Sequence, residues 1–285
     1  MIQLFLFILI VLILSKKYTT LEHFKNNNNN NPIFSIIIPL YNNDQYIIAT
    51  IKSVIYQTFK NFEIIIIDDK STDKSFIKTQ KFIKPYSNIK LLKNYKNIGV
   101  YKTINIGLNY INGTYFTVLG SDDTFHPNRL EEDYNSLNNT DYLATISKYN
   151  RYNVDGNLIH KPRFGESMIT FHKSIVAIIG KYLNCRYGGD TEYMNRFKLI
   201  IGKDKLKYNN KILYKSIHKE DNSNLTKIYN FKHDRKRIKH YFDILHQNYN
   251  SKITKTIQND LFRLLPKISI TKCDHINNIK ILKIK

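Results

Sequence analysis

Apolar residues run through the first half of the chain in short, almost continuous blocks that are separated by polar turns. The blocks cover residues 36–38, 62–67, 89–92 and 115–119. Continuous apolar runs of this length are typical of central parallel strands that are covered on both faces. Between the first two blocks, apolar residues recur every three or four positions over 44–57, which predicts an amphipathic helix. Strand, helix and strand in this order predict a right-handed crossover unit and an α/β fold.

Polar clusters follow three of these predicted strands. Tyr41 and Asn42 follow the first, residues 68–73 (Asp-Asp-Lys-Ser-Thr-Asp) the second, and residues 121–123 (Ser-Asp-Asp) the fourth. Because ligands of open parallel sheets bind at the carboxyl ends of strands, we expect these clusters to face one crevice. Adjacent carboxylates repel each other, and a divalent metal carried in with a diphosphate would neutralise them. The alternative is an acidic turn before a helix, with Pro127 in the first helical turn.

A glycine loop follows the third predicted strand. Residues 97–107 run from Asn97-Ile98-Gly99 into a helical pattern, an arrangement that often holds phosphate near backbone amides. The alternative is that Gly99 serves only the geometry of a strand-to-helix turn. Lys102 lies in the same segment and is a candidate contact to a diphosphate.

Together these motifs resemble glycosyltransferase family 2, whose members have the GT-A nucleotide-sugar fold. The resemblance covers residues 33–225. It implies an α/β fold with a mostly parallel central sheet flanked by helices, to which we add a C-terminal helical appendage. It also implies transfer of a sugar, with inversion, from a nucleotide diphosphate sugar to an acceptor hydroxyl. Mn²⁺ or Mg²⁺ on the diphosphate is the implied cofactor, and a UDP-sugar is the donor we expect first.

The resemblance assigns roles to individual residues. Tyr41 would stack on the nucleotide base, and Asp69 would hydrogen-bond the edge of that base. Asp122 would hold the ribose, and Asp123 would ligate the metal. His218 resembles a late Arg/His element that closes over the diphosphate, so we group it with Asp122 and Asp123 as the metal set. The remaining expected nucleotide-sugar contacts are Pro39, Asn42, Asn97, Gly99 and Lys102.

Two positions near the acid motif add detail. Many family members have Asp where this chain has Gly120, so any role for a third acid is lost while the final Asp pair remains. His126, just before Pro127, is expected on the acceptor side of the cleft.

Inverting transfer is a single displacement that needs a carboxylate to take the proton of the acceptor hydroxyl. Residues 187–196 resemble the Glu-Asp signature of the family, which makes Asp190 the implied general base. Gly189 replaces the usual Glu, so only Asp190 is carried over. The alternative role for Asp190 is to cap the helix that begins here. The same helix would carry Glu192 on another face, and Arg196 as a clamp for phosphate or carboxylate.

Composition leaves two rival functions open. The formal net charge is +21, but the basic residues are dispersed, and no nucleic-acid-binding motif accompanies them, so we do not expect nucleic acid as a partner. A nucleotidyltransferase would also use metal-binding acids, although its glycine-rich loop is missing after the first strand. A non-enzymatic basic binding module would leave the acids without a shared purpose. The two cysteines exclude a disulfide framework and a cysteine metal site.

The ends of the chain differ from the middle. Residues 1–17 contain fourteen apolar or nearly apolar positions before two lysines, which we interpret as a shallow or single-pass membrane anchor, with a cleaved signal peptide as the alternative. The two lysines that follow the apolar segment predict that the catalytic domain faces the cytoplasm. Residues 18–31 form an Asn-rich linker before the catalytic domain, 32–225. Residues 226–285 are predicted as basic helices that pack on the domain or contact an anionic membrane.

Within the catalytic domain, residues 32–130 are assigned to the nucleotide sugar and 131–225 to the acceptor side. The acceptor side carries no motif that identifies the acceptor, which leaves a glycan, a lipid or a protein open.

Overall fold

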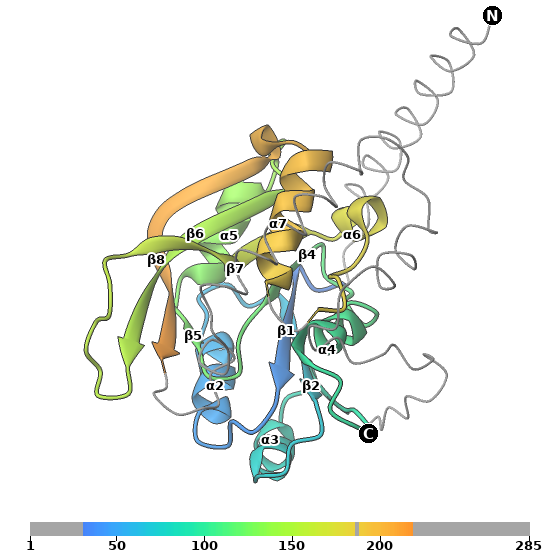
Figure 1. Ribbon diagram of the computed structural model, residues 1–285, viewed down its shortest axis with the longest axis vertical. Coiled ribbons are helices and arrows are strands. Elements are labelled where there is room, and N and C mark those ends of the chain that lie inside the picture. Colours follow the sequence, from blue (N-terminus) through green and yellow to red (C-terminus); the bar gives the residue numbers. More distant parts are fainter. Residues whose placement is uncertain (1–30, 186–187, 219–285) are drawn as a thin grey trace, which may run out of the picture.

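The computed structural model describes residues 31–185 and 188–218 (Figure 1). The predicted membrane anchor, almost all of the Asn-rich linker and the basic C-terminal region lie outside these described residues.

The predicted parallel strands form one half of an eight-stranded sheet. They are β1 (Phe34–Leu40), β2 (Phe62–Asp68), β3 (Ile89–Lys93) and β4 (Tyr115–Val118), in the order β3-β2-β1-β4. All neighbours in this half pair in parallel. The four predicted strands are therefore confirmed, and their carboxyl ends share one edge of the sheet.

The other half of the sheet mixes strand directions. β7 (Arg163–His172) pairs antiparallel with β4 and with β6 (Ala144–Asn153), and β6 pairs in parallel with the long β8 (Leu206–His218). The short β5 (Thr124–Phe125) pairs antiparallel with β8 and ends the order β4-β7-β6-β8-β5. Because only β7 and β5 oppose the common direction, the sheet is mostly parallel, as predicted.

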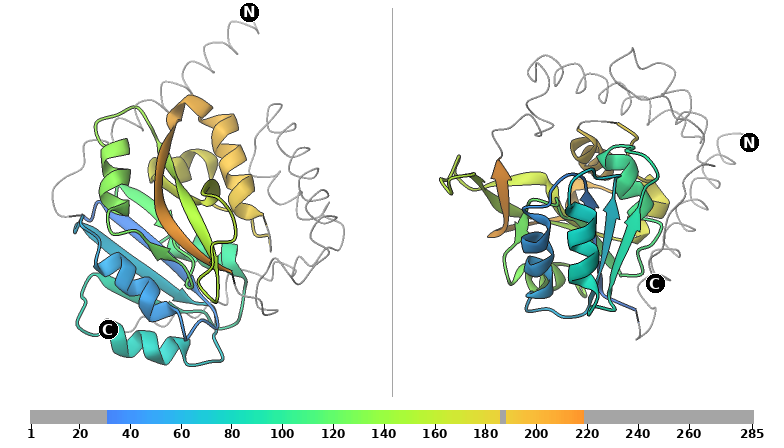
Figure 2. Two further views of the ribbon diagram at one scale, coloured as in Figure 1. Left: turned by 90° about the vertical axis from the view of Figure 1, so that its left-hand side faces the viewer. Right: turned by 90° about the horizontal axis from the view of Figure 1, so that it is seen from below.

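Helices cover both faces of the sheet (Figure 2). On one face, α2 (Ile47–Ile55), α3 (Ser75–Ile83) and α5 (Arg129–Leu137) pack over inward residues such as Ile36 and Ile38. On the other face, α4 (Val100–Gly107), α6 (Ser174–Ile179) and α7 (Gly189–Ile200) pack over residues that include Ile37. Alternate residues of β1 thus enter two separate cores, which explains why its apolar run is continuous. A short 3₁₀ turn, η1 (Lys203–Lys205), leads into β8.

Some predicted boundaries need correction. The helix expected over 44–57 spans Ile47–Ile55. Pro127 was expected in the first turn of a helix, but α5 begins at Arg129, with Asn128 as its N-cap. Pro39 lies inside β1, two positions beyond Ile37, the last β1 residue that pairs with β4. Because a proline has no backbone N–H to donate, its place beyond the end of β4 costs the sheet no hydrogen bond to that strand.

Among the described residues, none of the helices combines the length and apolar character needed to cross a membrane.

Candidate active site

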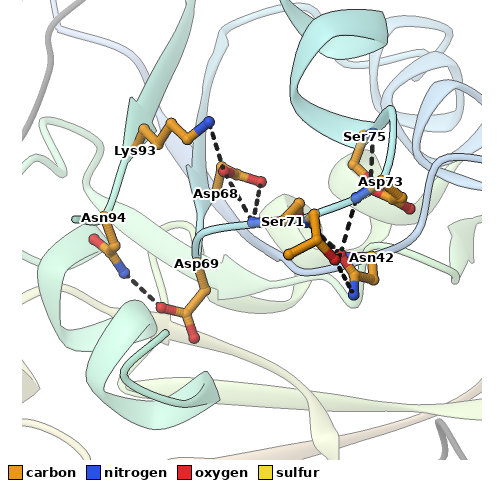
Figure 3. A network of polar contacts seen from close by, with 9 residues as sticks. Asn42, Asp68, Asp69, Ser71, Asp73, Ser75, Lys93 and Asn94 are labelled. Carbon is orange, nitrogen blue, oxygen red and sulfur yellow. Dashed lines mark hydrogen bonds and ion pairs between the residues drawn. The ribbon is translucent and has the colours of Figure 1, made fainter. Parts of the chain in front are cut away.

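The loop after β1 is fastened to the loop after β2 by Asn42 (Figure 3). Asn42 has a left-handed backbone, with φ of 48°. Its backbone N–H donates to Ser71 Oγ over 3.1 Å, and its Oδ1 accepts the N–H of Thr72 over 2.8 Å. Asn42 therefore joins two strand-end loops, and its side chain is occupied by that contact. The adjacent Tyr41 is 45% exposed, as a ring that stacks on a ligand must be.

Asp69, at the end of β2, holds the glycine loop. It is only 4% exposed. Its oxygens accept hydrogen bonds from Asn94 Nδ2 (2.9 Å), Ile98 N–H (2.9 Å) and Gly99 N–H (2.8 Å). A carboxylate offers about four acceptor positions, so one remains for a ligand. The expectation that the loop amides meet phosphate needs correction, since the amides of Ile98 and Gly99 are directed at Asp69 instead.

The neighbouring Asp68 shapes the turn itself. It is fully buried, accepts the N–H of Ser71 over 3.2 Å and lies 3.9 Å from Lys93 Nζ (Figure 3). Burial raises the pKa of Asp68, while Ser71 and Lys93 oppose that rise. We therefore assign Asp68 to loop architecture and Asp69 to the site.

Asp123, after β4, is held by β8. Its Oδ2 accepts the hydroxyl of Tyr214 over 2.8 Å, and its Oδ1 accepts the N–H of Ile217 over 3.1 Å. The same Tyr214 oxygen accepts the N–H of Gly120 over 3.3 Å. A Cβ at Gly120 would lie 2.8 Å from Asp123 Oδ2, so the carboxylate of Asp123 occupies the space that a side chain at position 120 would need.

Asp122 and Asp123 are adjacent carboxylates whose charges repel each other. Burial and the charge of Asp122 raise the pKa of Asp123 to about 7, although Tyr214 and Ile217 donate to it. A divalent cation would offset that repulsion, and carboxylate oxygens are the ligands that Mn²⁺ and Mg²⁺ favour. The pair therefore fits the implied metal.

His218 does not complete a preformed metal cluster. Over residues 31–185 and 188–218, no group of three or more His, Cys, Asp and Glu side chains is placed to hold a metal ion. His218 is the last residue of β8 and follows Ile217, whose N–H is bonded to Asp123. The described residues thus do not group His218 with Asp122 and Asp123 as a metal cluster, and the metal role of the Asp pair stays a prediction.

Asp190 lies in the first turn of α7 and is bonded to α4. Its Oδ1 accepts the hydroxyl of Tyr101 over 3.0 Å, and it is partly buried. The N-cap of α7 is Gly188, with φ of 68° and no side-chain cap. The alternative that Asp190 caps the helix is therefore wrong, and its carboxylate is directed to Tyr101 instead.

Glu192 and Arg196 form a buried pair that fixes α7. Arg196 donates through Nε to Glu192 Oε1 (2.8 Å) and through Nη2 to Glu192 Oε2 (2.7 Å). Arg196 also donates to the carbonyls of Ile179 and Lys181. With both side chains 2% exposed, Arg196 clamps a carboxylate of its own helix and cannot reach a phosphate. Glu192 is correspondingly buried and ion-paired within α7.

Among the described residues, no contact of Asn97, Lys102 or His126 assigns that residue a role in the site, and His126 lies beside Gln57, beyond the C-terminal end of α2. Asn97 is exposed, and Lys102 is half-buried in α4. His126 is exposed, and its backbone carbonyl accepts Gln57 Nε2 over 2.8 Å.

Four hydrogen bonds bring these loops together. Asn42 joins the β1 loop to Ser71, Asn43 Nδ2 donates to Ser121 Oγ over 2.6 Å, Asp69 holds Gly99, and Tyr101 holds Asp190. The loops after β1, β2 and β4 and the start of α7 thus belong to one connected edge. Sequence reasoning assigned no individual role to four residues of this edge, namely Ser71, Asn94, Tyr101 and Tyr214.

The chain is similar to proteins of known family and structure. A family described as "Glycosyl transferase family 2" matches residues 35–201, more than half of the chain. An uncharacterized glycosyltransferase of Rickettsia typhi is 39% identical over 115 residues, which are 40% of this chain and 35% of that protein. Glycosyltransferase GlyG of Streptococcus pneumoniae is 30% identical over 126 residues, 44% of this chain and 42% of GlyG. The chain thus spans less than half the length of both relatives.

Two solved structures resemble the fold. S. aureus TarS in complex with UDP-GlcNAc superimposes with a TM-score of 0.63 at 17% identity, covering 80% of this chain and 70% of that one. The mannosyltransferase PcManGT from Pyrobaculum calidifontis, in complex with GDP-Man and Mn²⁺, gives a TM-score of 0.58 at 12% identity, covering 87% and 75%. At these identities the likeness shows the fold alone.

Proposed function

Because this chain belongs to glycosyltransferase family 2 and has the GT-A fold, we propose that it transfers a sugar from a nucleotide diphosphate donor to an acceptor hydroxyl. The observation that carries this proposal is the connected edge, where Asp69, the Asp122–Asp123 pair and Asp190 belong to loops joined by hydrogen bonds. Of the two rivals, a basic binding module gives no reason for these acids to share one edge, and a nucleotidyltransferase lacks its glycine-rich loop after the first strand.

The donor would lie along the carboxyl ends of β1, β2 and β4. The exposed ring of Tyr41 suits stacking on a nucleotide base, and Asp69 retains one acceptor position for the edge of that base. We favour a UDP-sugar, since TarS is described with UDP-GlcNAc. PcManGT is described with GDP-Man, so a GDP-sugar is the alternative.

Asp123 and Asp122 would hold a divalent cation at the donor diphosphate. That ion, Mn²⁺ or Mg²⁺, supplies charge stabilisation for the departing diphosphate. Asp123 is suited to the role because it is oriented by two β8 donors. Burial and the charge of Asp122 raise its pKa, an effect that a bound cation would oppose. PcManGT is described with Mn²⁺, which supports the choice of a divalent metal.

Asp190 would take the proton of the acceptor hydroxyl as that oxygen attacks the anomeric carbon, giving inversion. The partial exposure of Asp190 leaves it accessible, whereas Glu192 is ion-paired and buried. The acceptor is a glycan, lipid or protein hydroxyl.

We also keep the proposal that residues 1–17 anchor the enzyme to a membrane, with the catalytic domain facing the cytoplasm.

Donor binding and hydrolysis test this function together. Calorimetric titration with UDP and with GDP, each with and without Mn²⁺, should show binding of one nucleotide that depends on the metal. A panel of nucleotide sugars should then reveal one donor that is slowly hydrolysed without acceptor. Failure of both nucleotides to bind, with no hydrolysis of any donor, would contradict the proposal.

A further inference from the structure

Tyr101 contacts the start of α7 in two ways. Its hydroxyl donates to Asp190 Oδ1 over 3.0 Å. Its ring lies against Gly189, where an added Cβ would come within 2.8 Å of ring carbons Cδ1 and Cε1. Because real Cβ atoms do not approach that closely, the ring occupies the space that a side chain at position 189 would need. Gly189 and Tyr101 therefore fit each other, and the fit aims the phenol at Asp190.

A stack of aromatic rings keeps Tyr101 in place. The rings of Tyr101 and Tyr182 lie 5.9 Å apart with planes 20° apart, and those of Tyr182 and Tyr193 lie 4.1 Å apart at 14°. Tyr193 belongs to α7, and its hydroxyl donates to the carbonyl of Gly180 over 3.1 Å. The stack thus joins α4 to α7 and restricts the rotation of each ring.

Tyr101 also lies close to the glycine loop. Gly99 is the N-cap of α4, and its N–H donates to Asp69 Oδ2. Tyr101 follows two residues later, in the first turn of the same helix. One short segment thus contacts the acid assigned to the nucleotide base at one end and the acid assigned to proton transfer at the other.

We propose that Tyr101 is a positioning residue, which holds Oδ1 of Asp190 and leaves Oδ2 to accept the proton of the acceptor hydroxyl. The proposal rests on the function proposed above. Tyr101 does not compete for that proton, because burial and the charge of Asp190 hold its pKa well above the usual tyrosine range. It donates its hydrogen bond at every working pH. Through α4, the placement of the base is coupled to the Asp69 loop.

Tyr101→Phe is the direct test, with Tyr193→Phe as the matched control. Both changes remove one part-buried hydroxyl from the same ring stack, but of the two only the Tyr101 hydroxyl is bonded to Asp190. With Mn²⁺ and the donor found by screening, Tyr101→Phe should lower kcat roughly ten-fold, because a hydrogen bond to a charged group is lost. The donor KM should stay within about two-fold of wild type, and the acidic limb of the kcat profile should move to higher pH.

Tyr193→Phe should change neither kcat nor the pH profile. Equal kcat and pH profiles for Tyr101→Phe and wild type would overturn the positioning role. Equal losses of kcat in Tyr101→Phe and Tyr193→Phe would also overturn it, because they would report only a weakened ring stack.

Gly189→Ala gives a second route to the same result. The added methyl must displace the Tyr101 ring, so kcat should fall with donor binding retained, and Tyr101→Phe should add little on that background. Fully additive losses would overturn the inference.

The proposed function is tested separately by Asp190→Asn. If Asp190→Asn abolishes turnover while turnover of Tyr101→Phe equals that of wild type, only the positioning role of Tyr101 fails. If the Asp190→Asn enzyme remains active, the proposed role of Asp190 as the general base is refuted.

Discussion

The hydroxyl of Tyr214 donates to Oδ2 of Asp123 over 2.8 Å, so a residue of β8 orients the acid that follows β4. We predict that Tyr214→Phe weakens Mn²⁺-dependent UDP or GDP binding by about 10- to 100-fold, the usual cost of losing a partner behind a metal ligand. Calorimetry measures this directly. Tyr149→Phe is the control, since Tyr149 is a buried phenol bonded to Arg163 rather than to the acid pair. Equal metal affinity in Tyr214→Phe and wild type would contradict the assignment of Asp123.

The raised pKa of Asp123 predicts that the stability of the metal-free protein depends on pH. The folded pKa of about 7 exceeds the usual value of 3.8, so the folded state binds this proton more tightly than the unfolded chain does. Its contribution to stability is fully present below about pH 4 and is lost as pH rises toward 7. Mn²⁺ competes with the proton, so the rise in Tm caused by Mn²⁺ should be large at pH 8 and small at pH 5.5.

Thermal unfolding across this pH range, with and without Mn²⁺, checks the expectation. Asp123→Asn removes the titrating group and should remove both the metal effect and its pH dependence. A Tm shift by Mn²⁺ that is the same in Asp123→Asn and wild type would place the metal elsewhere.

The Glu192–Arg196 pair is predicted to stabilise the fold and to take no part in proton transfer. Glu192→Gln leaves Arg196 buried with an uncompensated charge, which typically costs about 3–5 kcal/mol in the free energy of unfolding. Urea denaturation measures that loss. Folded Glu192→Gln protein should retain donor hydrolysis per molecule within a few-fold of wild type. A stable variant that has lost turnover would instead assign the base role to Glu192.

Strands of the first half of the sheet could be predicted because burial on both faces makes their sequences continuously apolar. β8 could not, since it alternates exposed Lys and Asn with a few buried residues such as Leu213 and Tyr214. The acids of the site lie in short local motifs and were predicted on that basis. Their partners were missed, because Tyr214 is 91 positions from Asp123 and Tyr101 is 89 from Asp190, and no local pattern reports such pairs.

Deletion of residues 1–31 tests the proposed anchor. The first strand begins at Phe34, and Ile33 is the nearest preceding residue bonded to the domain, through Asn61. The truncated protein should therefore fold, hydrolyse its donor and no longer sediment with lipid vesicles at moderate salt. Retained binding to anionic vesicles alone would point to the basic residues 226–285, and failure to fold would refute the independent anchor.

Asp190 is proposed to accept the proton of the attacking hydroxyl, and the decisive measurement is turnover by Asp190→Asn with donor affinity determined in parallel. Asparagine keeps the shape of the side chain and an oxygen that accepts the Tyr101 hydroxyl, but it does not accept the proton. We predict that kcat falls by about 10²- to 10⁴-fold while the Kd of the donor in the presence of Mn²⁺ is unchanged. Turnover close to wild type, or loss of donor binding with kcat preserved, would contradict the account.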